Sequence, residues 1–256
     1  YSVLPQYLRP RELVGGNGLV QGSTFLAIIF GTILGNELIL TEAGVTIVSV
    51  LVVMVAVAGF VASLFAPPAM PVWGAGASGP EGPVDYVFPR AIARLLALVM
   101  VNRPAFRAML AISWFWFLGA TFLSLLPAYA KEVLGADETV LTVLLAGFSI
   151  GVALGALLAE TACRGRKPSD IPAYGALGLA VMAVELYMAT PASPPRELMD
   201  RAAFFSGPEG WRILVDFVAL AAFAGLYVTP LNAVLQAEAE ERRRGQYIAA
   251  SNVVDA

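Results

Sequence analysis

Long apolar stretches, separated by short turns that carry most of the charge, dominate this chain. Charge-free runs extend over residues 43–66, 108–130 and 139–159. A helix rises about 1.5 Å per residue, so about 20 apolar residues cross a hydrocarbon layer of about 30 Å. The runs lack the residue-by-residue alternation of barrel strands. The pattern therefore predicts six membrane-spanning helices, at about 15–40, 43–66, 106–130, 139–160, 171–190 and 212–235, and the start of a seventh near Gln246.

Composition points to the same class of protein. Of the 256 residues, 58% are hydrophobic and 14% are charged, and the mean hydropathy is +0.74. A soluble domain has about a quarter of its residues charged. The sequence therefore predicts an all-α polytopic membrane protein.

Positive charges alternate between the two ends of the predicted spans. Twelve of the 16 Lys and Arg residues fall at one set of ends, and four fall at the other. Cytoplasmic loops carry an excess of Lys and Arg, so we expect the twelve to face the cytosol. They are Arg9, Arg11, Arg90, Arg94, Arg103, Arg107, Arg164, Arg166, Lys167, Arg242, Arg243 and Arg244, against Lys131, Arg196, Arg201 and Arg212 at the opposite ends.

The segment between the second and third spans has a different character. Residues 67–89 are rich in proline and glycine, which predicts a flexible linker. Behind it, residues 90–100 (RAIARLLALVM) place Arg90 and Arg94 on one helical face and leucines on another. This pattern fits either an amphipathic helix on the cytosolic membrane surface or an extended start of the third span.

The sequence offers little catalytic chemistry. It has no His, and the single Cys163 excludes both an internal disulfide and a cysteine zinc cluster. The net charge of −3 does not indicate a nucleic-acid partner. We therefore expect no enzyme activity, no cofactor and no metal in this chain. Because it begins at Tyr1 without Met and stops inside a new apolar segment, we expect a fragment of a longer protein.

The glycine-rich stretch 16–35 (GNGLVQGSTFLAIIFGTILG) allows two interpretations. A phosphate-binding loop requires G-x-G-x-x-G after a strand, whereas these glycines are spaced G-x-G-x-x-x-G and open an apolar helix. Glycines four residues apart let a second helix approach closely in a membrane. Tight packing is therefore the favoured interpretation, at Gly31 and Gly35 in the first span and at Gly147, Gly151 and Gly155 in the fourth.

Three segments resemble a known family. The first is residues 1–18, with YSVLP, then ELV at 12–14 and NG at 17–18; the others are residues 112–120 (ISWFWFLGA) and 129–135 (YAKEVLG). They resemble the lysophospholipid transporters of the major facilitator superfamily (MFS), including versions fused ahead of acyltransferase and acyl-carrier-protein (acyl-ACP) synthetase domains. The resemblance covers essentially the whole chain.

The resemblance implies a domain organisation. The six spans would correspond to helices five to ten of twelve. Residues 1–66 would end an N-terminal six-helix half, residues 67–104 would form the cytosolic linker with its amphipathic helix, and residues 105–256 would begin the C-terminal half. The resemblance also implies the bacterial inner membrane, with the linker and the Arg-rich loops in the cytosol.

Charges within spans need a reason, because each costs roughly 2.5–3.5 kcal/mol on insertion scales. Glu185 could accept a substrate ammonium or a proton, or it could stay hydrated near the outer interface. Asp216 lies four residues after Arg212, so an i,i+4 ion pair competes with a role in substrate binding. Phe223 and Tyr227 follow it at helical spacing, on a helix expected to line the transport cavity.

Two further segments offer candidate residues. Four aromatic residues at 114–117 (WFWF) either face lipid, or Trp116 lines a slot for an acyl chain together with Ser124. In the sixth span, Pro230 interrupts the helical hydrogen bonding near Asn232, which suits a hinge, a polar site or a simple kink.

The function that the resemblance implies is movement of lysophospholipids, such as lysophosphatidylethanolamine, across the bacterial inner membrane by alternating access, for re-acylation. The expected partners are membrane lipids, an amphiphilic substrate and a fused or associated acyltransferase/acyl-ACP synthetase. Two alternatives stay open. One is an MFS exporter of drugs or other amphiphiles, and the other is a membrane anchor for fused acyltransferase and synthetase domains.

Overall fold

The computed structural model describes residues 3–39, 41–65, 87–191, 198–240 and 243–255. Most of the linker predicted at 67–89 lies outside these residues. Within them the chain is helical, without a strand, apart from a single bridge between Ala136 and Met199. Six helices are long and apolar enough to cross a membrane, which confirms the all-α polytopic fold. They are Pro10–Ile39, Gly44–Leu64, Arg103–Val133, Glu138–Cys163, Ile171–Ala189 and Pro208–Glu238.

The helices begin and end close to the predicted bounds. The long ones are α2 (Leu13–Ile39), α3 (Gly44–Leu64), α5 (Arg103–Ala128, continued by the π-helical turn η2, Tyr129–Val133), α6 (Glu138–Cys163), α7 (Ile171–Ala189) and α9 (Pro208–Glu238). The start of the predicted seventh span is α10 (Arg244–Asp255). The shorter elements are α1 (Leu4–Tyr7), η1 (Pro10–Glu12), α4 (Phe88–Val101) and α8 (Arg201–Phe204).

Asn102 separates α4 from α5. Its backbone is extended (φ −92°, ψ 93°), and its side chain accepts a hydrogen bond from Ala105 N at 3.3 Å, which caps α5. The same side chain donates to the carbonyl of Glu238 at 2.9 Å and so ties this corner to the end of α9. The alternative in which residues 90–100 extend the third span is therefore wrong, since α4 is a separate helix. Its position on the membrane surface stays a prediction.

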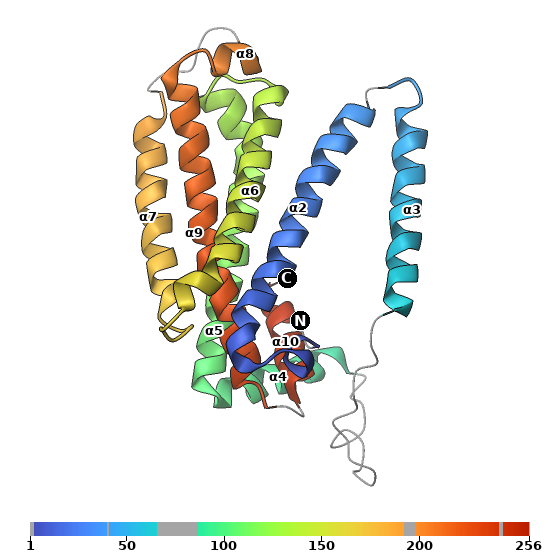
Figure 1. The fold of residues 1–256 in the computed structure, drawn as a ribbon, viewed down its shortest axis with the longest axis vertical. Helices are drawn as coiled ribbons and strands as arrows, with labels where there is room; N and C mark the ends of the chain where they lie inside the picture. The colour runs from blue at the N-terminus through green and yellow to red at the C-terminus, as the bar shows by residue number, and fades with distance from the viewer. Residues whose placement is uncertain (1–2, 40, 66–86, 192–197, 241–242, 256) are drawn as a thin grey trace.

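Helices α5, α6, α7 and α9 form a bundle, against which α2 leans along α6 and α9 (Figure 1). The closest approach is between α6 and α9. A Cβ built on Gly155 would overlap the carbonyl of Ala222, and one on Gly151 would overlap the carbonyl of Val218. A Cβ on Gly147 would lie 2.7 Å from Leu214 Cδ1. Gly151 and Gly155 thus lie where α6 meets α9 backbone to backbone, and Gly147 lies against side chains of α9.

The glycines of α2 lie in a different environment. A Cβ built on Gly31 or Gly35 would meet no atom of the described residues within 4 Å. In Figure 1, α2 leans away from α6 toward its C-terminal end, where α3 lies beside it. Of the described residues, none offers these two glycines a packing partner, so their packing role stays a prediction.

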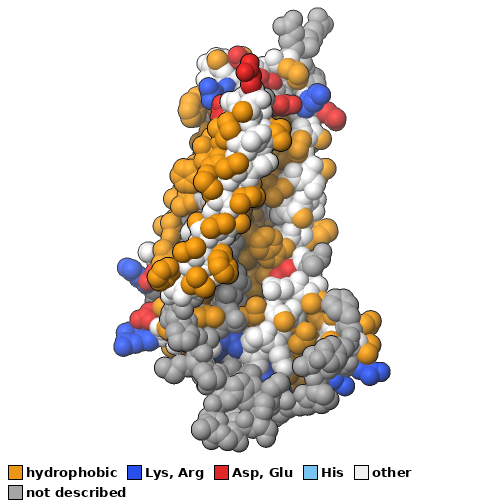
Figure 2. All heavy atoms as spheres, turned by 90° about the vertical axis from the view of Figure 1, so that its right-hand side faces the viewer, with side chains coloured by type: hydrophobic (Ala, Val, Ile, Leu, Met, Phe, Trp, Pro, Cys, Tyr) orange, Lys and Arg blue, Asp and Glu red, His pale blue; other side chains and the backbone are white. Residues whose placement is uncertain are grey.

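The Arg-rich turns gather at one end of the molecule. The N-terminal ends of α2 and α5, the C-terminal ends of α6 and α9, and α4 lie at the same end of the bundle (Figure 1). In the view of Figure 2, hydrophobic side chains cover most of the surface between charged groups that gather toward the two ends. This distribution matches a chain that crosses an apolar layer, while the side on which the Arg-rich end lies stays a prediction.

Candidate functional site

A pair of buried amides joins α2 to α9. Asn17 Nδ2 donates to Gln236 Oε1, and Gln236 Nε2 donates to Asn17 Oδ1, both at 2.8 Å. Asn17 Nδ2 also donates to the carbonyl of Leu13 at 2.8 Å. Both side chains are 1% exposed. Because a buried amide without a partner costs about 1–3 kcal/mol, this reciprocal pair fixes the position of α2 on α9. We call it the amide lock.

The residues around the amide lock allow α2 to approach this closely. Gly18 lies against α6, where a Cβ would overlap the carbonyl of Ala156. Leu13 and Val14, both 3% exposed, pack with Ala233 of α9 in a small apolar cluster. The lock therefore lies among apolar side chains and a bare glycine backbone, which exclude water from its hydrogen bonds.

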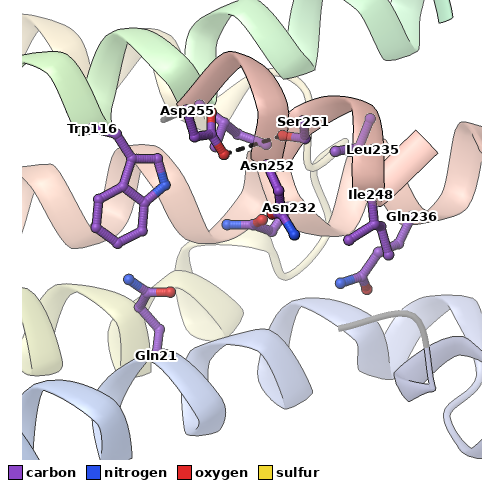
Figure 3. A pocket seen from close by; sticks show the side chains of 10 residues that line it. Gln21, Trp116, Asn232, Leu235, Gln236, Ile248, Ser251, Asn252 and Asp255 are labelled. Carbon is purple, nitrogen blue, oxygen red and sulfur yellow. Dashed lines mark hydrogen bonds between the residues drawn. The ribbon is translucent and has the colours of Figure 1, made fainter. Parts of the chain in front are cut away.

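A small hollow of about 70 Å³ lies beside the amide lock, between α2, α5, α9 and α10. Gln21 of α2 and Trp116 of α5 approach it from two sides (Figure 3). Its other walls come from α9 and α10. The lining residues are Gln21, Ile112, Trp116, Asn232, Leu235, Gln236, Ile248, Ser251, Asn252 and Asp255.

The lining combines four amides, one hydroxyl and one carboxylate. Asp255 Oδ1 accepts a hydrogen bond from Ser113 Oγ of α5 at 2.6 Å. Its Oδ2 accepts one from Ser251 Oγ at 3.3 Å, which Figure 3 shows. No Lys or Arg is among the lining residues of the described chain. The hollow can therefore hydrogen-bond a polar group and stabilise a positive charge. It has no group of three acidic or Cys side chains that could hold a metal ion among the described residues.

Of the predicted aromatic and hydroxyl residues in α5, Trp116 alone borders the hollow. Phe115 is buried in the bundle, whereas Trp114 and Phe117 are exposed and stack on one another with ring centroids 5.5 Å apart. Ser124 is exposed and lies outside the hollow. The structure thus places Trp116 at a polar hollow and does not bring Ser124 to it.

The predicted segment near the end of α9 does reach the hollow. Asn232 lines it, and its Nδ2 donates to the carbonyl of Val228 at 3.1 Å. Pro230 is buried inside α9, which continues past it to Glu238. Proline has no N–H, so the carbonyl four residues earlier lacks its helical donor. Whether this position acts as a hinge stays a prediction.

Phe223 and Tyr227 face a neighbouring helix rather than the hollow. Gly178 of α7 lies against the ring of Phe223, and a Cβ on Gly175 would come within 2.8 Å of the backbone of Tyr227. Tyr227 Oη donates to the carbonyl of Ala111 of α5 at 3.1 Å. These aromatic residues therefore pack α9 against α7 and α5, and their predicted place in a transport pathway stays untested.

The i,i+4 ion pair between Arg212 and Asp216, one of the two alternatives for this carboxylate, is not formed. Arg212 instead pairs across helices with Glu185 of α7, with Nε 3.1 Å from Oε1. Asp216 is buried, at 6% exposure, near Tyr129. Spacing along one helix suggested the i,i+4 pair, but it takes no account of Glu185 on the neighbouring helix α7.

The family model described as Major Facilitator Superfamily matches residues 1–256, which is the whole chain. The chain belongs to the major facilitator superfamily. The resemblance inferred from the sequence is thereby confirmed at the level of the family. The amide lock and the hollow are accordingly features of a multi-pass MFS membrane protein.

Two curated relatives are similar to this MFS chain. One is the lysophospholipid transporter LplT of Cronobacter sakazakii (strain ATCC BAA-894), which is 29% identical, and the other is the protein of the same name from Klebsiella pneumoniae (strain 342), which is 28% identical. Each alignment spans 238 residues, or 92% of this chain and 53% of the relative. The chain therefore spans about half the length of these relatives. No solved structure matches it significantly.

Sequence reasoning found Trp116 and Asn232 but missed most of the hollow. Gln21 and Gln236 were not singled out, although each lies four residues from a second amide, Asn17 and Asn232 respectively. Such i,i+4 amide pairs inside apolar helices are the signal that could have found them, since polar side chains in a membrane gather on protein-facing surfaces. Asp255 was missed because the seventh span was predicted only as a start near Gln246, without candidate residues.

Proposed function

We propose that the chain forms part of an MFS transporter that moves lysophospholipids across the bacterial inner membrane by alternating access. The observation that carries the proposal is the polar hollow between α2, from the predicted N-terminal half, and α5, α9 and α10, from the predicted C-terminal half. Alternating access needs a polar site at the boundary between two units that move relative to each other. The similarity to LplT proteins supports the substrate class.

The lining suits the headgroup of a lysophospholipid that carries an ammonium. Asp255 supplies the negative charge, and the amides of Gln21 and Asn232 can donate hydrogen bonds to phosphate oxygens. The single acyl chain would lie against the indole of Trp116, which is 44% exposed, and along the exposed apolar surfaces beyond it. A zwitterionic ethanolamine headgroup fits this set of groups better than a purely anionic one.

The contacts of α2 support a proposal for which end of the pathway is closed. Its buried positions run from Leu13 to Ile29, and all but Ile29 lie in the half nearer the Arg-rich end, where the amide lock ties it to α9. Residues 30–39 have no buried position among those described. With the Arg-rich turns in the cytosol, this conformation is closed on the cytosolic side.

Uptake by proteoliposomes tests the proposal. Trp116→Ala should lower the initial uptake of labelled lysophosphatidylethanolamine about tenfold, as the loss of 1.4 kcal/mol of apolar contact would do. Trp114→Ala is the matched control, since Trp114 is exposed in the same helix and lies outside the hollow. Equal uptake by the two variants, at equal protein incorporation, would contradict the assignment of the hollow.

The same assay separates the alternatives. Transport of a cationic dye without transport of the lysolipid would favour an exporter of drugs or other amphiphiles. Transport of neither compound by an intact, correctly oriented protein would favour a membrane anchor. We propose in addition that the imported lysolipid is re-acylated by a fused or associated acyltransferase. Formation of labelled diacyl lipid in cells that contain the protein, and its loss when the gene is deleted, tests that step.

The orientation in the membrane can be tested with one thiol. Cys163 is the only Cys of the chain and lies at the Arg-rich end of α6. Because it is partly buried, the better probe is Ser169→Cys in a Cys163→Ala background, since Ser169 is exposed in the following turn. A membrane-impermeant maleimide should label this site only when the cytosolic face is open to the reagent. Labelling from the periplasmic side of intact cells would reverse the proposed orientation.

A further inference from the structure

One oxygen of the buried Asp216 carboxyl lacks a hydrogen-bond partner among the described residues. Its side chain is 6% exposed, and its Oδ2 has no hydrogen-bond donor among the described residues. The neighbouring residues Phe217 and Leu220 of α9 are buried in the apolar core. An acidic side chain in an apolar environment needs either a positive charge or a proton.

The nearby polar groups are occupied with one another. Arg212, one turn earlier on α9, is paired with Glu185 of α7. Tyr129 of η2 shares a 2.8 Å hydrogen bond with Thr190. Tyr129, Glu185 and Arg212 are the titratable groups that interact electrostatically with Asp216. Helix α6 faces this part of α9 with Gly147, which lies against Leu214 and Val218 and brings no charge.

We propose that Asp216 is a proton-binding site, and that its ionisation transfers Arg212 from Glu185 to Asp216. In the conformation described here Asp216 holds the proton, so no net charge is buried without a partner. When the proton leaves to solvent, the carboxylate attracts the guanidinium one turn away on the same helix. Glu185, which is partly exposed, then stays ionised in contact with water.

The exchange has a structural consequence. The Arg212–Glu185 pair ties α7 to α9 at the end of the bundle opposite the Arg-rich turns. Transfer of Arg212 to Asp216 replaces this tie by a contact within α9 alone. Protonation of one buried carboxyl thereby sets whether the ends of two helices are linked. This site is separate from the polar hollow and does not depend on the proposed substrate.

Infrared spectroscopy of the purified protein in lipid tests the protonation directly. A protonated carboxyl gives a C=O stretching band that a carboxylate lacks. The wild-type spectrum minus that of Asp216→Asn should contain this band at neutral pH. Glu209→Gln is the matched control, because Glu209 is an exposed acid in the first turn of α9, and its difference spectrum should lack the band. A wild-type-minus-Asp216→Asn spectrum without the band would overturn the proposal.

Two further variants test the exchange of Arg212. Glu185→Gln leaves Arg212 free to pair with Asp216, so the band should be lost. The double variant Glu185→Gln/Arg212→Gln removes the arginine as well, so the band should return. A band that persists in the single variant would exclude the transfer. A band absent from both variants would assign the proton to Glu185 and overturn the proposal. None of these measurements uses a transport substrate, so the outcome is independent of the proposed function.

Discussion

Replacing Gly155 of α6 with alanine tests how much of the stability of the bundle depends on backbone contact between α6 and α9. An added Cβ would lie 2.7 Å from the carbonyl carbon of Ala222 and 2.9 Å from its Cα, and would overlap the carbonyl oxygen. All three atoms belong to the backbone of α9, so no side chain can rotate away. Gly225 of α9 lies on the facing surface and meets the backbone of Val152 and Ala156 in turn.

The expected effect can be worked out from these distances. Carbon atoms in contact prefer about 3.5–4.0 Å, so α9 must move away by roughly 1 Å at this point. A gap of that size forfeits a quarter to a half of each nearby dispersion contact, and overpacking of a tight core costs about 1–3 kcal/mol. Alanine returns up to about 1 kcal/mol through its higher helix propensity. Because the opposing atoms all belong to the backbone, the cost should lie in the upper part of its range, at about 2–3 kcal/mol. We therefore expect Gly155→Ala to lower the free energy of unfolding by about 1–2 kcal/mol.

Thermal unfolding in detergent, followed by tryptophan fluorescence, measures this change. The expected loss lowers the midpoint by about 2–8 °C for a chain of this size. Gly119→Ala is the matched control, because a Cβ on Gly119 of α5 meets no described atom within 4 Å. It should leave the midpoint unchanged or raise it. If both variants unfold at the same temperature, the close contact of α6 with α9 does not contribute as reasoned here.

Two further predictions concern the ends of helices. Gln236→Ala leaves the buried Oδ1 of Asn17 without its donor, while Asn17 Nδ2 keeps its bond to the carbonyl of Leu13. We expect a loss of about 1–3 kcal/mol, largely recovered in the double variant Asn17→Leu/Gln236→Leu, and thermal unfolding of both variants and the wild type checks this. Hydrogen bonds from Thr139, chiefly from its hydroxyl, lower the pKa of Asp137 at the start of α6. The ionised Asp137 therefore stabilises the folded protein at any pH above the ordinary pKa of an aspartate. This stabilisation is lost as the pH falls through the lowered pKa. Asp137→Asn should remove this dependence of the free energy of unfolding on acid pH, by less than about 1 kcal/mol because the side chain is exposed. Unfolding midpoints of the variant and the wild type, compared from neutral to acid pH, check it.

The membrane spans were predictable from the sequence because their signal is additive along the chain. The predicted span at 171–190 corresponds to α7, and the span at 139–160 corresponds to α6, which begins where Asp137 caps it. The separate helix α4 was one of two alternatives, and the extended backbone of Asn102 decides between them. Charge counts also sorted the turns into two groups that the fold places at two ends.

The side of each helix that packs against other helices could not be predicted in the same way. A membrane helix is apolar toward lipid and apolar toward its neighbours, so hydrophobic periodicity does not reveal the buried face. Asp216, Phe223 and Tyr227 share one face of α9, and the sequence gives no sign that this face meets α7 rather than a cavity. Asn232 and Gln236 lie on the face that does border the hollow. Amide pairs within apolar helices therefore indicate the site better than single acids do.

The two kinds of contact around α9 respond differently to separation. The α6–α9 contact consists of bare backbone surfaces at Gly155 and Gly225. If these surfaces separate, water does not replace the van der Waals contacts that are lost. The amide lock between α2 and α9 consists of two hydrogen bonds, each worth about 0.6–2 kcal/mol inside a membrane protein. When these amides part, water or a polar headgroup in the adjacent hollow can replace both bonds at little cost. Motion that opens the Arg-rich end should therefore separate α2 from a rigid α6–α9 pair.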